Sequence, residues 1–180
     1  MAEQIILAVD EQGNFSGEYI AKEAGHQGQG KKHLAIAVLL YNLEGEVLLQ
    51  RRKHQVFDNI WDLTGATHPL HTPEGDETLE EATWRCLERE YGIKEKIPLR
   101  NLGFFDYFAK YGDLCENEHC AFMIGEYSGE VKLNPEVGYG CEWVDKDWFL
   151  KDMAQNPLQY TPWAVEAVKL MKNITIGQGS

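Results

Sequence analysis

Hydrophobic and polar residues alternate in several parts of the chain, a pattern that places successive side chains on opposite faces of a β-strand. The clearest example begins at His33, continues as Leu-Ala-Ile-Ala-Val and predicts a strand over residues 33–41. An Asn-Leu-Glu-Gly turn follows, and residues 46–51 resume the strand pattern, so we expect a β-hairpin. Further strands are predicted at residues 4–9, 61–64, 102–109, 119–127 and 140–144.

A loop rich in Gly, Thr and Pro is expected at residues 65–76, and a helix should follow over residues 79–89. Thr78 and Glu81 have the spacing of a capping box, strong helix formers fill the interior, and Gly92 provides a stop. Further helices are predicted near residues 146–153 and 162–171. Together these elements predict a mixed α/β fold (α+β) with a mixed sheet.

Length and composition favour a single domain. The chain has 180 residues, of which 43% are hydrophobic, and this is enough to build one ordinary core. We expect the domain to cover residues 1–172 and a loose tail to cover residues 173–180. The start of the chain lacks a basic region, and its apolar run at residues 5–9 is too short for a signal peptide or membrane span. The expected location is therefore the cytoplasm.

The charge of the chain limits its partners. A formal net charge of -12 argues against binding to nucleic acid or to a membrane, and no basic cluster interleaved with aromatic residues offsets it. The oligomeric state is not predicted, because no apolar periodicity marks an interface. The cysteines lack paired CxxC spacing and are expected to be reduced thiols. They are Cys86, Cys115, Cys120 and Cys141.

Three histidines and two glutamates form a candidate metal site. Imidazole and carboxylate ligands together suit divalent ions such as Zn, Mn or Mg. The two glutamates are two residues apart, which places them on the same face of a strand. The alternative is that each residue is a separate, hydrogen-bonded surface or core group, as single histidines often are. The five residues are His26, His33, His68, Glu116 and Glu118.

A further carboxylate, Glu90, lies on the apolar face of the predicted helix. It shares that face with Cys86, Thr83 and Leu79, which precede it by four, seven and eleven residues. A buried carboxylate without a cation is costly, so we expect a metal ion or a basic partner for Glu90. The alternative places Glu90 at the rim of the face, paired with Arg85 or with solvent.

The same helix resembles part of a known family. Residues 65–70, Gly-Ala-Thr-His-Pro-Leu, and residues 85–93, Arg-Cys-Leu-Glu-Arg-Glu-Tyr-Gly-Ile, resemble a stretched Nudix box, with Glu77 between them. The resemblance implies a Nudix-like α/β/α sandwich. The Nudix pattern has glutamates where this chain has Cys86 and Arg89. Because those glutamates hold magnesium in Nudix hydrolases, their replacement argues against ordinary Nudix hydrolysis.

From its first strand to Trp163 the chain resembles one branch of that superfamily, the type I isopentenyl diphosphate isomerases. That family binds a divalent ion through two histidines seven apart, a His-Pro histidine and a Glu-Asn-Glu motif, which correspond to the five candidate ligands. The resemblance also implies a second, substrate-bridging Mg at Glu90. The basic residues that contact the diphosphate correspond to Lys22, Arg51 and Arg52, although the two arginines also suit a solvated strand end.

The isomerases move a double bond by adding a proton to one carbon and removing a proton from another, which requires an acid and a base. Glu118 corresponds to one of these groups, with Tyr107 as its expected hydrogen-bonding neighbour. Alternatively, Tyr107 is a core aromatic residue whose hydroxyl reaches the surface. Trp163 corresponds to the family's tryptophan, whose indole face stabilises a transient cation, and simple helix packing is the alternative for it.

The chain departs from the isomerases two residues before His68, where they carry a catalytic cysteine and this chain has Ala66. Alanine cannot transfer a proton, and the hydroxyls of Thr64 and Thr67 have no accessible ionised form near neutral pH. Cys120 lies on the same face as the glutamates only if no bulge intervenes. Because one acid/base group contributes a factor of roughly 100 to 10,000, we expect lowered isomerase activity.

Three functions therefore remain open. The favoured one is a divalent-metal-dependent isomerase of isopentenyl or dimethylallyl diphosphate with a compromised proton step. The second is a Nudix hydrolase of a small diphosphate or nucleotide that uses Glu90 and the surface formed by Glu80, Glu81 and Glu88. The third is a noncatalytic isoprenoid-diphosphate binder, for which Ala66 is the best support. The first and third take an isoprenoid diphosphate as their ligand, and the second takes a small diphosphate or a nucleotide.

Overall fold

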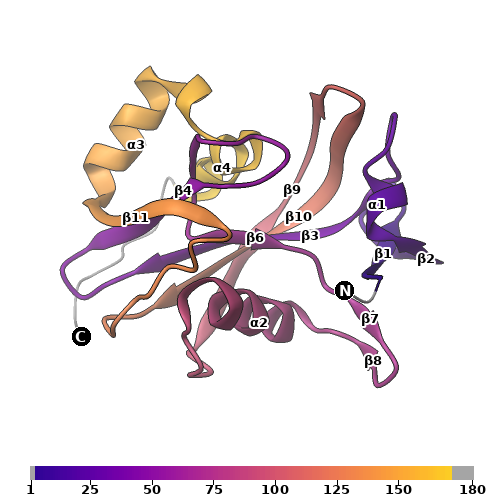
Figure 1. Cartoon of the computed structure of the whole chain (residues 1–180), viewed down its shortest axis with the longest axis horizontal. Coiled ribbons are helices and arrows are strands. Elements are labelled where there is room, and N and C mark those ends of the chain that lie inside the picture. The colour runs from indigo at the N-terminus through magenta and orange to yellow at the C-terminus, as the bar shows by residue number, and fades with distance from the viewer. Residues whose placement is uncertain (1–2, 172–180) are drawn as a thin grey trace.

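The structure is a computed structural model that describes residues 3–171 of the chain. Its centre is a nine-stranded mixed sheet in which β11, β4, β3, β1 and β2 follow one another, while β10 runs parallel to β3 and pairs with β9 (Figure 1). The strands are β1 Ile5–Val9, β2 Phe15–Ala21, β3 His33–Tyr41, β4 Glu46–Arg52, β5 Trp61–Asp62, β6 Gly65–Thr67, β9 Leu99–Tyr111, β10 Leu114–Glu126 and β11 Gly138–Asp145. A separate two-stranded hairpin consists of β7 His71–Thr72 and β8 Gly75–Asp76.

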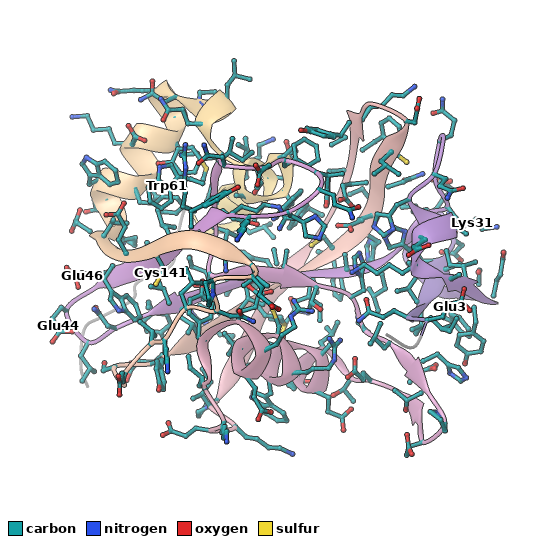
Figure 2. The ribbon with its side chains drawn as sticks, viewed as in Figure 1. Glu3, Lys31, Glu44, Glu46, Trp61 and Cys141 are labelled. Atoms are coloured by element: carbon teal, nitrogen blue, oxygen red, sulfur yellow. The ribbon has the colours of Figure 1, made fainter. Side chains whose placement is uncertain are left out.

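Helices cover both faces of the sheet (Figure 1). Alternate residues of β3 point to opposite sides: Ala35 and Ala37 pack in a core that includes Trp163, while Ile36 and Val38 pack in a core that includes Leu87. Side chains fill both layers (Figure 2). The predicted mixed α/β class with a sandwich of layers is confirmed. The α-helices are α1 Lys22–Gly25, α2 Leu79–Tyr91, α3 Lys146–Gln155 and α4 Pro162–Ala167, and two short 3-10 helices are Pro157–Gln159 and Val168–Met171.

The capping signals of α2 are confirmed. The Thr78 hydroxyl accepts from the Glu81 backbone N–H at 3.1 Å, and the Glu81 carboxylate accepts from the Thr78 N–H at 2.8 Å. Gly92 ends the helix with a φ of 69°, which favours glycine. The helix predicted over residues 162–171 instead changes to a 3-10 helix at Val168. The tail predicted at residues 173–180 lies outside the described residues.

The region after β5 differs from the prediction. Residues 65–67, expected in a loop, form the short strand β6 and pair with β3. The predicted hairpin of β3 and β4 pairs only next to its turn, at Tyr41 and Val47. Further along, the Thr64 hydroxyl lies between the two strands, accepting from the Leu40 N–H at 2.8 Å and donating to the Leu48 carbonyl at 2.7 Å. One buried side chain thus replaces backbone pairing and opens the hairpin, so that β6 can join β3.

Thr64→Val should therefore destabilise the protein more than its small change in shape suggests. The side chain is completely buried, and the valine would leave a backbone donor and a backbone acceptor without partners. We expect a loss of about 2–4 kcal/mol in the free energy of unfolding, measured by denaturant titration. Thr72→Val in the exposed β7–β8 hairpin is the matched control, and an equal loss in both variants would contradict the role of Thr64.

Two simpler expectations concern the whole chain. Among the described residues, no helix is both long and apolar enough to cross a membrane. All four cysteines are free thiols, as their spacing predicted. β2 was missed by the sequence analysis, because its residues are mostly exposed and give little alternation.

Candidate metal centre

The five predicted ligands converge. His26, His33, His68, Glu116 and Glu118 each offer one nitrogen or oxygen atom, and all these atoms lie within 4.8 Å of one another. The imidazole rings surround a common point, with centroids 4.6–5.1 Å apart. Four of the five residues are buried, and His26 is half-buried. This compact set of donors has the size and composition of a site for one divalent ion.

The register of the sheet explains part of this convergence. In the parallel pair of β10 and β3, Glu118 lies beside His33, and in the antiparallel pair of β10 and β9 it lies beside Tyr107. Glu116 follows the same face of β10, two residues away. His26 comes directly after α1, and its carbonyl accepts from the Cys115 N–H at 2.8 Å, which attaches this segment to β10.

Backbone carbonyls fix the protonation of two histidines. The Nδ1 atom of His26 lies 2.6 Å from the Lys22 carbonyl, and the Nδ1 atom of His33 lies 2.7 Å from the Lys31 carbonyl. Since a carbonyl only accepts, each neutral ring carries its proton on Nδ1 and presents a lone pair on Nε2. The Nε2 atom of His26 faces Glu116 Oε2 at 3.0 Å, and that of His33 faces Glu118 Oε1 at 3.4 Å.

An imidazole lone pair that faces a carboxylate favours a cation between the two atoms, either a proton or a metal ion. The Nε2 atom of His33 is buried without a hydrogen-bond partner, as is the Nδ1 atom of His68. Burial, followed by the charges of Lys22 and the neighbouring histidines, lowers the pKa of His68 well below its usual value, so its ring stays neutral and able to coordinate. The residues present therefore fit a divalent ion held by three imidazoles and two carboxylates.

Tyr107 and Glu118 form a buried pair. Burial raises the pKa of Tyr107 well above its usual value, and the charge of Glu118 raises it further, so the phenol stays protonated and donates to Glu118 Oε2. Burial also tends to raise the pKa of Glu118, but the neighbouring His33 and the hydrogen bond from Tyr107 outweigh it, and the net shift is downward. Glu118 is therefore a carboxylate whose two oxygens have different neighbours, histidines at Oε1 and a phenol at Oε2.

Arg85 and Glu77 position His68, a role that the sequence analysis missed. Arg85 donates to the His68 carbonyl at 2.8 Å and binds Glu77 through two nitrogens at 2.6 and 2.7 Å. The Glu77 carboxylate also accepts from the Leu70 N–H at 3.0 Å. The loop between β6 and β7 is thus tied to α2 on both sides of the His-Pro pair. The alternative that pairs Arg85 with Glu90 is wrong, because Arg85 binds Glu77 instead.

Glu90 has partners of its own and does not join the five ligands. Its Oε1 accepts from Arg89 Nη2 at 2.5 Å, and its Oε2 accepts from Gln50 Nε2 at 2.9 Å. The side chain approaches β6 closely, since a Cβ on Gly65 would lie 3.1 Å from Oε2. The cation expected for this buried carboxylate is a guanidinium. Arg89 thus occupies the place next to Glu90 where a second cation was expected, and each carboxylate oxygen accepts one hydrogen bond.

Trp163 and Arg52 are held by a buried carboxylate that the sequence analysis also missed. Asp62 Oδ1 accepts from Trp163 Nε1 at 2.7 Å and from the Thr161 hydroxyl at 2.9 Å, while Oδ2 pairs with Arg52 at 3.3 Å. The Arg52 guanidinium lies 4.8 Å from the centre of the Trp163 ring. The sequence contained a signal, because Asp62 is a charged residue inside a predicted strand.

Asp62 should give the protein a distinctive pH dependence. Burial, only partly offset by Arg52 and the hydrogen bonds, raises its pKa from 3.8 to about 6. Because the folded state binds the proton more tightly than the unfolded state, this group lowers stability as pH rises from about 4 to about 6. Asp62→Asn lacks this titration. The free energy of unfolding of the wild type relative to Asp62→Asn should therefore fall by about 3 kcal/mol between pH 3.5 and 7. A constant difference would contradict the shift.

An apolar wall, formed by Trp163, Phe57 and Ala66, lies beside the pair of Glu118 and Tyr107. The Trp163 ring lies 6.0 Å from Tyr107 and meets Phe57 edge-on at 5.5 Å, measured between ring centres. Ala66 packs against the same core, and its partner across the β6–β3 pair is Ala37. The register of β10 is unbroken between residues 118 and 120, so Cys120 lies on the Glu118 face. Burial, together with the Glu118 charge, raises the pKa of this thiol well above its usual value.

The three basic residues that were predicted to contact a diphosphate lie in different surroundings. Lys22 begins the short α1, four residues before His26, and burial lowers its pKa together with the charge of Arg89. Arg52 faces Trp163, as described above. Arg51 points elsewhere, since its Nε donates to Asn59 at 2.9 Å and its guanidinium lies over the Trp61 ring at 5.4 Å. Lys22 and Arg52 are therefore better placed than Arg51 to contact a ligand of the site.

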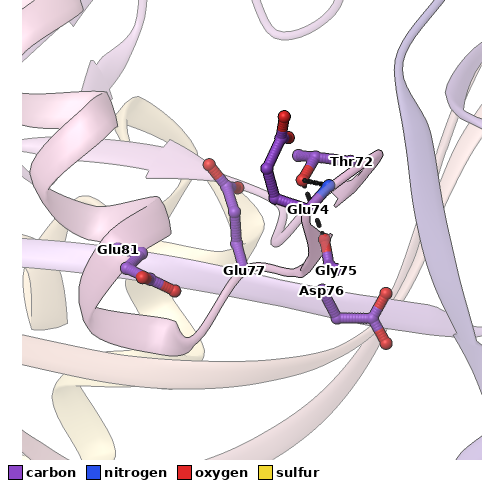
Figure 3. A pocket seen from close by; sticks show the side chains of 6 residues that line it. All are labelled: Thr72, Glu74, Gly75, Asp76, Glu77 and Glu81. Atoms are coloured by element: carbon purple, nitrogen blue, oxygen red, sulfur yellow. Dashed lines mark hydrogen bonds between the residues drawn. The ribbon is translucent and has the colours of Figure 1, made fainter.

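An acidic hollow of about 280 Å³ beside the β7–β8 hairpin has no comparable donor set (Figure 3). Figure 3 shows the Thr72 hydroxyl closing the hairpin through Gly75. Three of its four carboxylates already serve the fold, because Asp76 binds His71 at 2.7 Å, Glu77 binds Arg85 and Glu81 belongs to the capping box. This hollow therefore offers no second metal centre.

Comparison with known proteins agrees with this architecture. The NUDIX domain family matches residues 31–164. Isopentenyl-diphosphate Delta-isomerase of Halorhodospira halophila is 31% identical over 163 residues, 88% of this chain and 89% of that protein. The Serratia proteamaculans isomerase is 28% identical over 170 residues, 93% of this chain and 90% of that protein.

Solved structures show the same fold. DR0079 from Deinococcus radiodurans superposes with a TM-score of 0.70 at 17% identity, covering 93% of this chain and 98% of that chain. A MutT NUDIX hydrolase from Burkholderia pseudomallei gives a TM-score of 0.56 at 19% identity, covering 79% and 99% of the two chains.

Proposed function

Because this chain belongs to the NUDIX family and is similar to isopentenyl-diphosphate isomerases over most of its length, we propose that it acts on isopentenyl or dimethylallyl diphosphate. The proposed reaction is a slow, divalent-metal-dependent isomerisation by addition and removal of protons. The observation that carries this proposal is the five-ligand cluster, which shares Glu118 with the buried Tyr107 pair and lies next to the Trp163 wall. Mg, Mn and Zn all suit these ligands.

Each residue has a part in this chemistry. A bound divalent ion would fix the Glu118 carboxylate and neutralise part of the charge of the site. Glu118 carries a proton to or from an allylic carbon, and Tyr107 orients its Oε2 by donating to it. The Trp163 ring, fixed by its hydrogen bond to Asp62, offers a π face to a tertiary cation. Lys22 and Arg52 supply positive charge for the diphosphate in an otherwise acidic protein.

The proposed reaction lacks a second proton-transfer group on the face of the substrate opposite Glu118. Ala66 occupies the position of the isomerases' cysteine and has no proton to give or accept. Cys120 is next to Glu118 on the same face of β10, and burial together with the Glu118 charge raises the pKa of its thiol well above the usual value, so it is a poor replacement for the missing group. We therefore propose a rate lower by a factor of roughly 100 to 10,000 than that of an isomerase with both groups.

A second candidate is a noncatalytic isoprenoid-diphosphate binder, which Ala66 favours. This function needs the metal cluster, the cations and the apolar wall, but no proton donor at residue 66. The hydrolase alternative is less suited to the site. Its helix surface relies on Glu90, which pairs with Arg89, and on Glu81, which serves the capping box.

One assay separates these functions. The purified protein is incubated with Mg²⁺ and either isopentenyl diphosphate or nucleoside diphosphates, and both dimethylallyl diphosphate and released phosphate are measured. Isomer formation that disappears in Glu118→Gln supports the proposed isomerase. Saturable binding without any product supports the binder, and phosphate release without isomer would support the hydrolase and contradict the proposal.

A further inference from the structure

The environment of Glu90 departs from what a substrate-bridging metal site needs. The carboxylate is 5% exposed and lies between α2 and β6, where Gly65 lets it approach the strand backbone. Arg89 reaches one of its oxygens at 2.5 Å and Gln50 the other at 2.9 Å. Gln50 is itself fixed, since its Nε2 also donates to the Tyr91 hydroxyl at 3.1 Å. The charge of Glu90 is thus neutralised by a residue of its own helix.

Arg89 has capacity left for a ligand. Its contacts to Glu90 and to the Cys86 sulfur both use Nη2, and 41% of its side chain is exposed. A guanidinium carries five N–H donors. Its side-chain contacts to other described residues use only Nη2, so the donors on Nε and Nη1 are available to the oxygens of a ligand. Guanidinium groups bind phosphate oxygens through two parallel hydrogen bonds.

Another cation, Arg52, lies close to this pair along β4. Arg52 is two residues from Gln50, which donates to Glu90, and its guanidinium lies 3.3 Å from Asp62 and 4.8 Å from the centre of the Trp163 ring. Like charges this close repel one another, and an anion among them would relieve the repulsion. The protein as a whole has a net charge of -12, so a diphosphate ligand needs cations such as these beside it.

We infer that Arg89 takes the place of the second divalent ion at Glu90, so that the diphosphate is held by one metal ion together with Lys22, Arg52 and Arg89. This inference rests on the proposed function, because it assumes the five-ligand metal centre and a diphosphate ligand. It makes Arg89 a residue that determines how the ligand is held, and it gives Glu90 the task of fixing the guanidinium. The ligand bound in this way would be a diphosphate without an accompanying magnesium ion.

The test uses inorganic pyrophosphate as the probe. The protein is loaded with one equivalent of Mn²⁺, freed of excess metal and titrated calorimetrically with pyrophosphate, at trace and at millimolar Mg²⁺. The wild type should bind at trace Mg²⁺, and added Mg²⁺ should not improve its affinity. Arg89→Ala should bind about tenfold more weakly at trace Mg²⁺, because one charge-assisted contact is lost. Millimolar Mg²⁺ should restore its affinity, since Glu90 is then free to bind an ion.

Two further variants make this test specific. The double variant Arg89→Ala/Glu90→Gln should bind weakly at both Mg²⁺ concentrations, because no carboxylate remains to hold the ion. Arg100→Ala is the matched control, since Arg100 is exposed and pairs with Ile124, six residues along β10 from Glu118. Wild-type binding that requires Mg²⁺ and is lost in Glu90→Gln would overturn the inference while leaving the proposed function intact. Failure to retain Mn²⁺ at all would contradict both.

Discussion

Ala66→Cys should form dimethylallyl diphosphate from isopentenyl diphosphate at least about 100-fold faster than the wild type, because it restores a missing acid/base group. A cysteine thiol with an ordinary pKa of about 8.5 is protonated near neutral pH and can still release its proton, whereas a methyl group cannot. Residue 66 is suitably placed, since β6 and β10 flank β3 on opposite sides and Ala66 and Glu118 both come from the layer that contains Trp163. The measurement is the initial rate of isomer formation at saturating Mg²⁺.

Ala66→Ser is the matched control for this experiment. It has nearly the same shape as the cysteine variant, but its hydroxyl does not ionise in the accessible pH range. We expect no comparable gain from serine. Equal rates for alanine, serine and cysteine, with substrate still bound, would show that residue 66 does not limit the reaction, and the assignment of the proton step would then be wrong.

His33→Ala should lower the affinity for the divalent ion by more than about 100-fold, since loss of a direct ligand costs more than loss of its supporting partner. His33 is completely buried, its Nδ1 is fixed by the Lys31 carbonyl, and its Nε2 faces Glu118. Glu118 cannot move into its place without breaking the register of β10 with β3. Metal content after dialysis, measured for Mn and Zn, and the dissociation constant of each ion provide the readout.

The control for this variant is His71→Ala. His71 is an exposed imidazole on β7 that also binds a carboxylate, Asp76, but it lies outside the cluster. It should leave metal affinity unchanged. If His33→Ala retained the ion as tightly as His71→Ala does, the five residues would be a hydrogen-bonded cluster and the proposed metal centre would be wrong. Melting temperatures of both variants show whether folding is preserved.

Local patterns in the sequence were sufficient for the elements with strong signals. The alternation after His33 predicted β3 within its observed bounds, and the Thr78 capping box and Gly92 predicted both ends of α2 closely. The short strand β6 was missed because three residues carry no periodicity, and its pairing depends on Thr64 bridging two other strands. The opened hairpin of β3 and β4 is likewise a tertiary effect that no local pattern encodes.

The candidate site shows the same division. Ligand types and the spacing of Glu116 and Glu118 pointed to a metal, but only the parallel pairing of β10 with β3 brings His33 beside Glu118. The partner of Glu90 was left open between a metal and a base, because both satisfy the same electrostatic requirement. Sequence position gave no indication that Arg89, adjacent along the helix, would fill that role.

The ligands of the cluster come from distant parts of the chain, residues 26 to 118, and His26 belongs to the segment that connects β2 with β3. An ion that binds only when these parts are assembled acts as a removable crosslink between the N-terminal strands and the β9–β10 hairpin. Its stabilisation grows with the logarithm of its concentration over the dissociation constant. Divalent cation supply would thereby set how firmly the amino-terminal edge is attached, and chelation would expose it to proteases before the remainder of the sheet unfolds.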